Sequence, residues 1–472
     1  MDKEIQNIEY LDIFPTIKHY DWGVLGKNSM VYSLSKHTRD LNYSSKEISL
    51  PFAELWYGTH KSGPSFVYIN DGNIVNLNKA LNNLDNDFLG TSYTNKLFIN
   101  NTQERLDLNN LNNLNNNYVL PFLLKILSIS KPLSLQVHPN HNVARALFNE
   151  QPDIYLDPNP KPEIAIALTK FEALCGFRKY EDIIETLKEY PELSLYLNLD
   201  NNKSNIPSKT NSELLKYIFT KLLNISDSTI IIILKSIIHR LEKKNEKDIN
   251  IIDSLILRLH SYFPYDFGII SPIFLNYFQL EPGDSLFIGD GTIHSYLLGE
   301  CVECMGNSDN VIRCGLTTKY KDKNTLLRAL NFDNNTFYFW KQCETQICNY
   351  YLNTKLELNH IYNHVNSNLL YYLHTEDLHF TTPIINDYKI YSIDQFHIQK
   401  LNFVKSNSIF KKKLSSTSPI IILCINGQGE VFLNKSQSIV KLYQGKCIII
   451  SANSDIIIKS SNYLLIIIVY AP

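Results

Sequence analysis

Four side chains in three separated segments have the chemistry of metal ligands. Gln136 and His138 lie in LSLQVHPN, Glu163 lies in PNPKPEIAIAL and His294 lies in GDGTIHSYL. Strand side chains alternate with a period of two, so Gln136 and His138 are expected on one face of an extended segment. Nitrogen and oxygen ligands without a thiolate suit a zinc ion that keeps one coordination position open. The set predicts a catalytic site for one zinc ion per chain.

Positive side chains flank the same segments. They are Lys125, Lys161, Arg313 and Lys319. Lys161 precedes Glu163 by two residues, so on an extended segment the two side chains share a face. Arginine and lysine bind phosphate and carboxylate oxygens through charge-assisted hydrogen bonds. The chain carries a net charge of only −2, so recognition of an anion must be local. We therefore expect a small anionic substrate, with no nucleic acid or membrane partner.

The length and composition are those of a globular protein with several domains. The chain has 472 residues, of which 44% are hydrophobic. The first residues, MDKEIQNIEY, carry charges where a signal peptide would need an apolar run, so we expect a cytoplasmic protein. Cys301 and Cys304 form one CxxC, but no second one completes a four-thiolate site. Buried free thiols on a strand are the prediction for this pair.

The periodicity of apolar residues changes twice along the chain. Short β-rich runs separated by Gly, Pro, Asn and Asp predict a metal-binding jelly roll formed by residues 1–177 with 263–334. An Asn-rich tract, about residues 80–117, lacks the apolar density to pack and is predicted to be a disordered insertion. Helical spacing over 178–262 predicts a helical insertion domain, with Ser212 and Asp227 as N-terminal caps. Strand patterns return over 335–472.

The last part of the chain contains an internal repeat of the segment that carries His294. LEPGDSLFIGDGTIHSYL (280–297) aligns without gaps to LYQGKCIIISANSDIII (442–458), and Gly283 aligns with Gly445. A turn, an apolar strand and a second turn are typical of one hairpin of a jelly roll. Ile456 replaces His294 in the repeat. We therefore predict a mainly β protein with an α-helical insertion, made of two jelly rolls and a helical domain, in which only the first jelly roll binds metal.

Several segments resemble the type I mannose-6-phosphate isomerase (phosphomannose isomerase) family of zinc enzymes with a cupin fold. They are YDWGVLG (20–26), PFAELWYGTHKSGPS (51–65), LPFLLKILSISKPLSLQVHPN (120–140), KPEIAIALTKFEALCGFR (161–178) and LEPGDSLFIGDGTIHSYLLGECVECMGNSDNVIRCGLTTKYKD (280–322). The resemblance implies interconversion of mannose 6-phosphate and fructose 6-phosphate through an enediol, which supplies mannose for GDP-mannose. It implies a cytoplasmic enzyme, and we expect a monomer.

The resemblance also implies roles for individual residues. It makes Gln136, His138, Glu163 and His294 the zinc ligands and Arg313 a catalytic residue. It places a further set in or around a sugar phosphate pocket: Trp22, Glu54, Lys125, Ser134, Lys161, Tyr296, Glu303, Asp309 and Lys319. The family commonly has histidine at Pro160 and proline at Thr318, so a ring-opening role for that histidine cannot be transferred to this chain.

Aldose to ketose isomerisation moves a proton between two neighbouring carbons, so the site needs a Lewis acid and a proton carrier. Arg313 is a poor base because a guanidinium keeps its proton, and we expect it to stabilise an oxyanion or hold phosphate. Glu303 is the candidate proton carrier, and a structural glutamate paired with an arginine is the alternative. Two other functions are compatible with the architecture: a sugar-binding protein without catalysis and a metal-dependent dioxygenase.

Overall fold

The computed structural model describes residues 8–39, 44, 48–68, 74–90, 119–197, 210–333, 336–341, 385–393, 396–413, 416 and 418–471. The chain divides into two compact units. The first unit comprises Met1–Ser128, Val302–Asn307 and Gln342–Pro472, and the second comprises Ile129–Cys301 and Ser308–Lys341. Each unit is described separately below.

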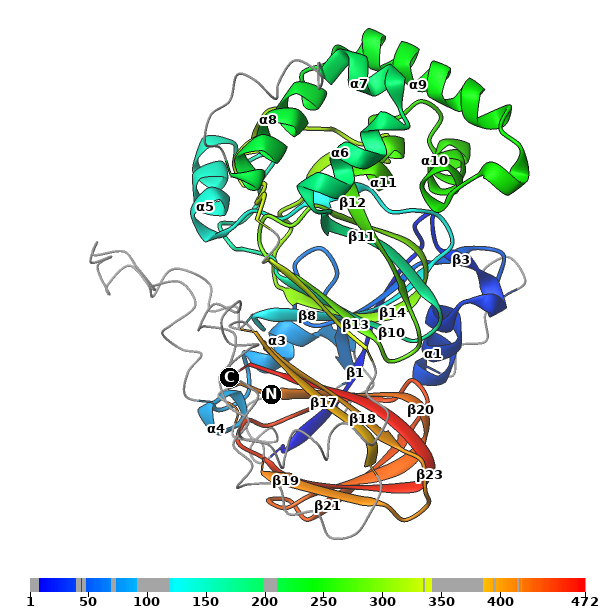
Figure 1. Ribbon diagram of the computed structural model, residues 1–472. Coiled ribbons are helices and arrows are strands. Elements are labelled where there is room, and N and C mark those ends of the chain that lie inside the picture. Colours follow the sequence, from blue (N-terminus) through cyan, green and yellow to red (C-terminus); the bar gives the residue numbers. More distant parts are fainter. Residues whose placement is uncertain are drawn as a thin grey trace, which may run out of the picture. The chain divides into compact units, whose positions relative to one another are not determined.

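The first unit is built mainly of antiparallel strands from both ends of the chain (Figure 1). Its N-terminal elements are β1 (Tyr10–Phe14), β2 (Thr16–Lys18), β3 (Val24–Leu25), the 3-10 helix η1 (Gly26–Asn28), α1 (Met30–Arg39), β4 (Pro51–Phe52), β5 (Glu54–Tyr57), β6 (Phe66–Tyr68), β7 (Ile74–Asn76), α3 (Leu77–Leu81), α4 (Asn86–Leu89) and β8 (Phe122–Ile129). Its C-terminal elements are β17 (Ile385–Ile393), β18 (Phe396–Phe403), β19 (Ile409–Lys413), β20 (Ile420–Leu433), β21 (Ser438–Tyr443), β22 (Cys447–Ile450) and β23 (Asp455–Tyr470).

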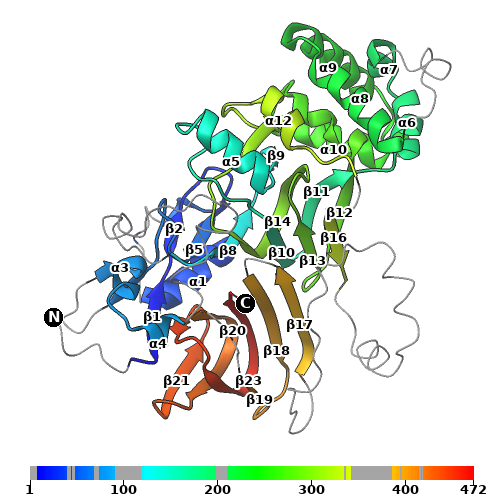
Figure 2. The same cartoon turned by 90° about the vertical axis from the view of Figure 1, so that its left-hand side faces the viewer.

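One sheet of the first unit combines N-terminal and C-terminal strands. Its order is β17-β18-β23-β20-β22-β1-β6-β7, with β19 beside β23 and β21 beside β20. Strand β1 pairs with β22 in the register Tyr10 to Ile450, and its last residues pair with β6. Figure 2 shows the C-terminal strands curving around a common interior, which alternate apolar residues such as Val440 and Leu442 fill. The N-terminal strand is therefore part of the C-terminal sheet.

The beginning of the predicted Asn-rich insertion is folded. Residues 77–81 and 86–89 form the short helices α3 and α4, and the side chains of Leu81 and Phe88 are buried. The prediction of disorder from residue 80 is therefore wrong as far as residue 90, because these two apolar side chains provide enough buried surface to order the segment. The rest of the predicted insertion, residues 91–117, lies outside the described residues.

The second unit combines a β-sheet with a group of helices. Its strands are β9 (Leu135–Val137), β10 (Glu163–Ala167), β11 (Phe171–Phe177), β12 (Leu275–Leu280), β13 (Ser285–Ile288), the first part of β14 (His294–Gly306), β15 (Ile312–Gly315) and β16 (Phe337–Trp340). Its helices are α5 (His141–Glu150), α6 (Tyr180–Lys188), α7 (Pro191–Leu197), α8 (Asn211–Leu223), α9 (Asp227–Glu242), α10 (Ile251–Tyr262), α11 (Ser271–Phe274) and α12 (Lys323–Ala329), with short 3-10 helices η4 (Glu246–Asp248) and η5 (Phe267–Ile270).

The helices α8 and α9 begin one or two residues earlier than the sequence predicts. The N-terminal cap of α8 is Thr210, whose hydroxyl accepts the Glu213 amide while the Glu213 carboxylate accepts the Thr210 amide. Ser226 caps α9 in the same way without the reciprocal bond. The predicted caps point elsewhere: Ser212 donates to Asp333, and Asp227 pairs with Lys323. Several Ser, Thr and Asp residues adjoin each helix start, so composition alone could not select the cap.

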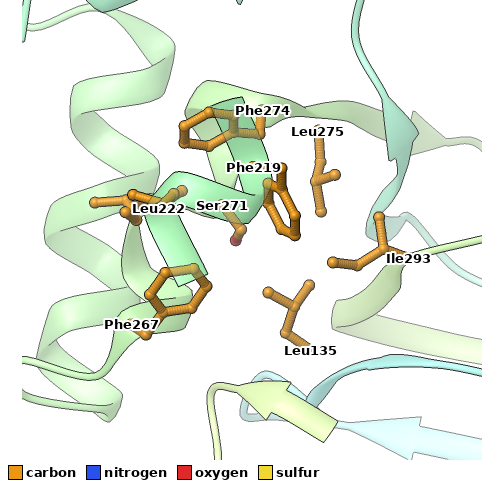
Figure 3. A pocket seen from close by; sticks show the side chains of 9 residues that line it. Leu135, Phe219, Leu222, Phe267, Ser271, Phe274, Leu275 and Ile293 are labelled. Atoms are coloured by element: carbon orange, nitrogen blue, oxygen red, sulfur yellow. The ribbon is translucent and has the colours of Figure 1, made fainter. Parts of the chain in front are cut away.

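The apolar faces of the helices and one face of the sheet share a single core in the second unit. Leu135 on β9 and Ile293 before β14 belong to the same buried cluster as Phe219 on α8. A cavity of about 10 Å³ remains among them, lined also by Phe274 and by Ser271, whose buried hydroxyl has no hydrogen-bond partner in the described part of the chain (Figure 3). The helices thus pack directly behind the strands that carry Gln136 and His294.

Within the described residues, no single helix is both long and apolar enough to cross a membrane, and α8 with α9 reaches that length only as a pair bent by 101°. The predicted fold class, mainly β with a helical insertion, is confirmed. Cys301 and Cys304 are buried free thiols on β14, as predicted. The predicted boundaries of three domains remain a prediction.

Candidate metal centre

Adjacent strands of the second unit place three of the predicted site residues in one row. Arg313 on β15 is the register partner of Gln136 on β9, and Gln136 is in turn the partner of His294 on β14. Side chains of residues that face each other on antiparallel strands project to the same side of a sheet. Cys175 on β11 extends the row as the next partner of His294. The sheet therefore presents the guanidinium, the amide, the imidazole and the thiol on one face.

Three of the predicted ligands converge in the interior of this unit. His138 Nε2 lies 3.1 Å from one carboxylate oxygen of Glu163, and His294 Nε2 lies 3.4 Å from the other. The candidate ligand atoms of the three residues all lie within 4.8 Å of one another, and each residue is 1% exposed. Because a common metal ion needs ligand atoms gathered at this scale, the cluster has the dimensions of a small-cation site.

Backbone carbonyl groups orient both imidazole rings. His138 Nδ1 donates to the Asn310 carbonyl at 2.7 Å, and His294 Nδ1 donates to the Thr292 carbonyl at 2.9 Å. With the proton on Nδ1, each ring presents the lone pair of Nε2 to Glu163. His138 Nε2 and Glu163 Oε2 are buried and have no hydrogen-bond partner among the described residues. These two buried acceptor atoms face a common point and lack a donor among the described residues, an arrangement that a cation between them would satisfy.

The protonation states of this cluster also suit a metal. Burial lowers the pKa of His138 to about 4, and the Lys161 ammonium acts in the same direction. Burial alone would raise the pKa of Glu163, but Lys161 and His138 hold it well below its ordinary value. Near neutral pH the cluster therefore contains a neutral imidazole and an ionised carboxylate, which are the metal-binding forms. Burial raises the pKa of the Cys175 thiol well above its usual range, so it stays a neutral neighbour.

Gln136 stands beside the cluster as a fourth candidate ligand. Its amide nitrogen lies 3.3 Å from His294 Nε2, and its amide oxygen accepts a hydrogen bond from Ser134 at 3.0 Å. Rotation of the amide by half a turn would bring the oxygen to the metal side. The Ser134 hydroxyl can donate or accept, so it supports either orientation. Ser134, predicted as a pocket residue, thus contacts the side chain of a candidate ligand.

The remaining predicted residues of this unit take different positions. The Lys161 ammonium lies 3.0 Å from Glu163, and the Tyr296 ring lies 6.1 Å from the His294 ring, so both belong to the cluster. Burial lowers the pKa of Arg313, which is mostly buried beside Gln136, and Tyr155 opposes that change. Lys319 lies on an exposed turn. The backbone amide of Asp309 donates to the Asp157 carboxylate.

A second polar cluster lies in the first unit. The Lys125 ammonium on β8 pairs with the Glu303 carboxylate at 3.2 Å, and both side chains are almost fully buried. Lys125 also lies over the Trp56 ring at 4.9 Å from its centroid, and Trp56 Nε1 donates to Glu54. The structure therefore joins three predicted pocket residues, Glu54, Lys125 and Glu303, around a tryptophan. Glu303 is an ion-paired glutamate, and its partner is a lysine.

Some residues of these clusters were not identified by sequence reasoning. Trp22 stacks on Tyr20 with 5.6 Å between the ring centroids, and Trp56 takes the central place in the second cluster. The sequence feature that could have identified Trp56 is its position two residues after Glu54, which puts both side chains on one face of β5. Asn310 acts through its backbone carbonyl, for which residue type gives no signal. Tyr155 donates to Asp322 in a separate segment, a pairing that only the fold reveals.

The fold and this site define a metal-binding β protein with a helical insertion between the segments that carry its ligands. Residues 11–180 match the model of the phosphomannose isomerase type I catalytic domain, and residues 191–275 match the model of that family's helical insertion domain. The chain belongs to the type I phosphomannose isomerase family.

Individual relatives agree with this assignment. A probable mannose-6-phosphate isomerase of Dictyostelium discoideum is 38% identical over 67% of this chain and 68% of its own length. The mannose-6-phosphate isomerase of Homo sapiens is 34% identical over 68% of this chain and 73% of its own. The fold is shared with a phosphomannose isomerase mutant from Salmonella typhimurium, at a TM-score of 0.69 and 24% identity, over 98% of this chain and 100% of that one. A zinc-bound mannose 6-phosphate isomerase matches at a TM-score of 0.67 and 24% identity, over 98% of this chain and all of its own.

Proposed function

We propose that this protein is a zinc-dependent isomerase that interconverts mannose 6-phosphate and fructose 6-phosphate. The observation that carries the proposal is the buried cluster of His138, Glu163 and His294, with two acceptor atoms aimed at a common point. Membership of the type I phosphomannose isomerase family supports the choice of reaction and substrate. These three side chains and the Gln136 amide would hold one zinc ion, which supplies a Lewis acid for the oxygens of an open-chain sugar.

The protein side chains have separate tasks in this proposal. Lys161 keeps Glu163 ionised and adds a positive charge beside the ligands, so the site as a whole attracts an anionic enediolate. Arg313, fixed by its strand next to Gln136, retains its proton and stabilises negative charge on a substrate oxygen. We assign Glu303 the transfer of the proton between the two carbons, with Lys125 holding its carboxylate in place.

The remaining predicted pocket residues belong to the same proposal. Glu54, Trp22, Ser134, Tyr296, Asp309 and Lys319 would line the substrate pocket, with Lys319 as a surface cation for the phosphate group. The cytoplasm and a monomeric state are the expected location and assembly. The net charge of −2 supports the expectation that neither nucleic acid nor an anionic membrane is a partner.

The test is a coupled assay of the purified protein, first freed of metal with a chelator and then reloaded. We expect fructose 6-phosphate from mannose 6-phosphate only after zinc is returned, at a stoichiometry of one ion per chain. Glucose 6-phosphate, the epimer, serves as the matched control substrate. Absence of turnover with bound zinc would refute the isomerase, and oxygen consumption with iron in its place would favour the dioxygenase. Sugar phosphate binding without any turnover would favour the binding protein.

A further inference from the structure

Asp157 joins two loops that approach the candidate metal centre. One loop, residues 157–162, leads into β10 and Glu163, and the other, residues 307–311, leads into β15 and Arg313. One oxygen of the Asp157 carboxylate accepts the Ser308 hydroxyl at 2.7 Å, and the other accepts the Asp309 amide at 2.8 Å. A single carboxylate thus ties together chain segments that are about 150 positions apart in sequence.

The amide side chain of Asn310 completes the connection. It donates to the backbone carbonyls of Asp157 at 2.8 Å and Asn159 at 2.9 Å, and to the Asp157 carboxylate at 3.2 Å. The Asn159 amide donates to the same carboxylate at 3.0 Å. Ser308 and Asn310 are 2% and 1% exposed. These hydrogen bonds join two buried side chains, Ser308 and Asn310, to the half-buried Asp157 and Asn159. They fix the relative position of the two loops, because loss of a bond at Ser308 or Asn310 leaves a desolvated polar group.

This network ends at a candidate ligand. The backbone carbonyl of Asn310, whose side chain and amide the network holds, accepts the His138 Nδ1 proton at 2.7 Å. That bond sets the ring orientation and leaves the Nε2 lone pair directed at Glu163. Displacement of the loop would move the carbonyl and let the imidazole turn. The same loop movement would also release the segment that carries Lys161 and Glu163.

We infer that Asp157 is a positioning residue of the metal centre, which holds the Asn310 carbonyl against His138 and the Lys161–Glu163 segment beside it. This inference rests on the proposed zinc function. Asp157 does not contact the cluster itself; it acts through the two loops. Outer partners that orient metal-binding histidines commonly change metal affinity by about 10 to 100-fold when they are removed.

The test compares zinc binding by the full-length wild-type protein with the Asp157→Asn variant. Asparagine keeps the shape of the side chain but replaces one acceptor oxygen by a donor. In one orientation its NH2 group faces the Asp309 amide, and in the other it faces the Asn159 amide and the Asn310 side chain, so neither orientation satisfies all the donors. Asp153→Asn is the matched control, because Asp153 is an exposed residue of the same connecting segment.

The readout is the zinc dissociation constant of the metal-free protein, measured by competition with a chelating indicator and without any substrate. We expect the constant to rise by about 10 to 100-fold in Asp157→Asn and to stay unchanged in Asp153→Asn. Cobalt(II) in place of zinc should give shifted visible absorption bands in Asp157→Asn, since the bands report ligand geometry. Saturating zinc should restore most of the turnover, with the KM for the sugar phosphate nearly unchanged.

Ser308→Ala provides a second variant that removes one neutral partner of the carboxylate. Its effect on the zinc dissociation constant should have the same direction, and the double variant should lose less than the two single losses combined. An unchanged zinc constant and cobalt spectrum in Asp157→Asn, even with a lower melting temperature, would overturn the inference and leave the proposed function standing. Zinc binding by wild type without isomerase activity would refute the proposed function, while the comparison of zinc constants would still decide the role of Asp157.

Discussion

Replacement of Lys161 by methionine should lower the stability of the metal-free protein and increase the stabilisation that zinc provides. Methionine has a similar length and no charge. Lys161 and Glu163 are 7% and 1% exposed, and the ammonium lies 3.0 Å from the carboxylate. The variant therefore leaves a buried carboxylate without its cation. The charge of the zinc ion can replace the missing charge, whereas solvent reaches this site poorly.

The separation of the two charges sets the size of the effect. Opposite unit charges 3.0 Å apart attract each other by about 5.5 kcal/mol at an effective dielectric constant of about 20. Part of this attraction compensates for burial of the ammonium, a cost that the variant no longer has. Removal of one partner from a buried pair usually costs about 3 to 5 kcal/mol. We expect a loss of about 3 kcal/mol in the free energy of unfolding of the metal-free protein at pH 7, measured by urea denaturation.

The loss of stability caused by Lys161→Met should be larger near neutral pH than in acid. Lys161 is the main cause that lowers the pKa of Glu163 against the effect of burial. A lowered carboxyl pKa contributes stability that is present above the unfolded pKa of about 4.5 and is lost as the pH falls through the folded value. In the variant the folded pKa rises, so this contribution disappears at a higher pH. The difference between wild type and variant should therefore be greatest near neutral pH and should shrink in acid.

Lys216→Met is the matched control, because Lys216 is exposed on α8 of the same unit and its substitution should change stability by less than about 0.5 kcal/mol. Zinc should raise the melting temperature of Lys161→Met by more than it raises that of wild type. Equal stability of the metal-free variant and wild type at pH 7 would show that Glu163 does not depend on Lys161. An equal zinc-induced shift in both proteins would show that the ammonium and the metal do not share that carboxylate.

Three further substitutions test other parts of the two units. Glu303→Gln should leave the zinc content normal by metal analysis and reduce turnover in the coupled assay by about 100-fold or more. Near-normal turnover would show that Glu303 does not transfer the proton. Arg313→Lys should fold normally by circular dichroism and lose much of its activity, because an ammonium cannot replace the planar donors of the guanidinium; full activity would contradict this role. Ser271→Ala should raise the free energy of unfolding, measured by urea denaturation, by about 1 kcal/mol, because the buried hydroxyl has no hydrogen-bond partner among the described residues. A loss of stability would indicate that this hydroxyl binds an ordered water molecule.

The part of the site that the sequence predicts is the part that local geometry determines. A period of two places Gln136 and His138 on one face, and Lys161 and Glu163 on another, before any pairing of strands is known. The structure brings His138, Glu163 and His294 together, which supports their selection by residue type. Their roles as zinc ligands remain a prediction. Trp22 shows the limit of this reasoning, since a motif residue without a known strand partner could not be placed.

The features that the sequence does not predict depend on contacts between distant segments. Pairing of β1 with β22 joins residues about 440 positions apart, and apolar patterns of similar strands cannot specify which pair forms. The Asn310 carbonyl orients His138, but every residue has a backbone carbonyl, so the residue type does not indicate this role. Helix starts show the same limit on a smaller scale. Thr210 rather than Ser212 caps α8 because Glu213 stands three residues after it and completes the reciprocal bonds.

The internal repeat relates the candidate metal centre to the C-terminal sheet. Gly283 and Gly445 have φ values of 95° and 83°, and each is the third residue of an equivalent turn, closed by the Asp284 amide donating to the Glu281 carbonyl in one and the Lys446 amide donating to the Tyr443 carbonyl in the other. A left-handed glycine in both turns supports the alignment of the two hairpins.

The register extends this equivalence to the ligands themselves. Glu163 pairs with Ile288 on the strand after the first turn, and Ile420 pairs with Ile450 on the strand after the second. Ile420 therefore occupies the position equivalent to Glu163, and Ile456 occupies the position equivalent to His294. Both isoleucines are fully buried in an apolar core. A carboxylate or an imidazole at either place would be desolvated without a partner. The same backbone thus gives a packed core in one unit and a candidate metal centre in the other, because the Lys161 ammonium compensates for the cost of burying the Glu163 carboxylate.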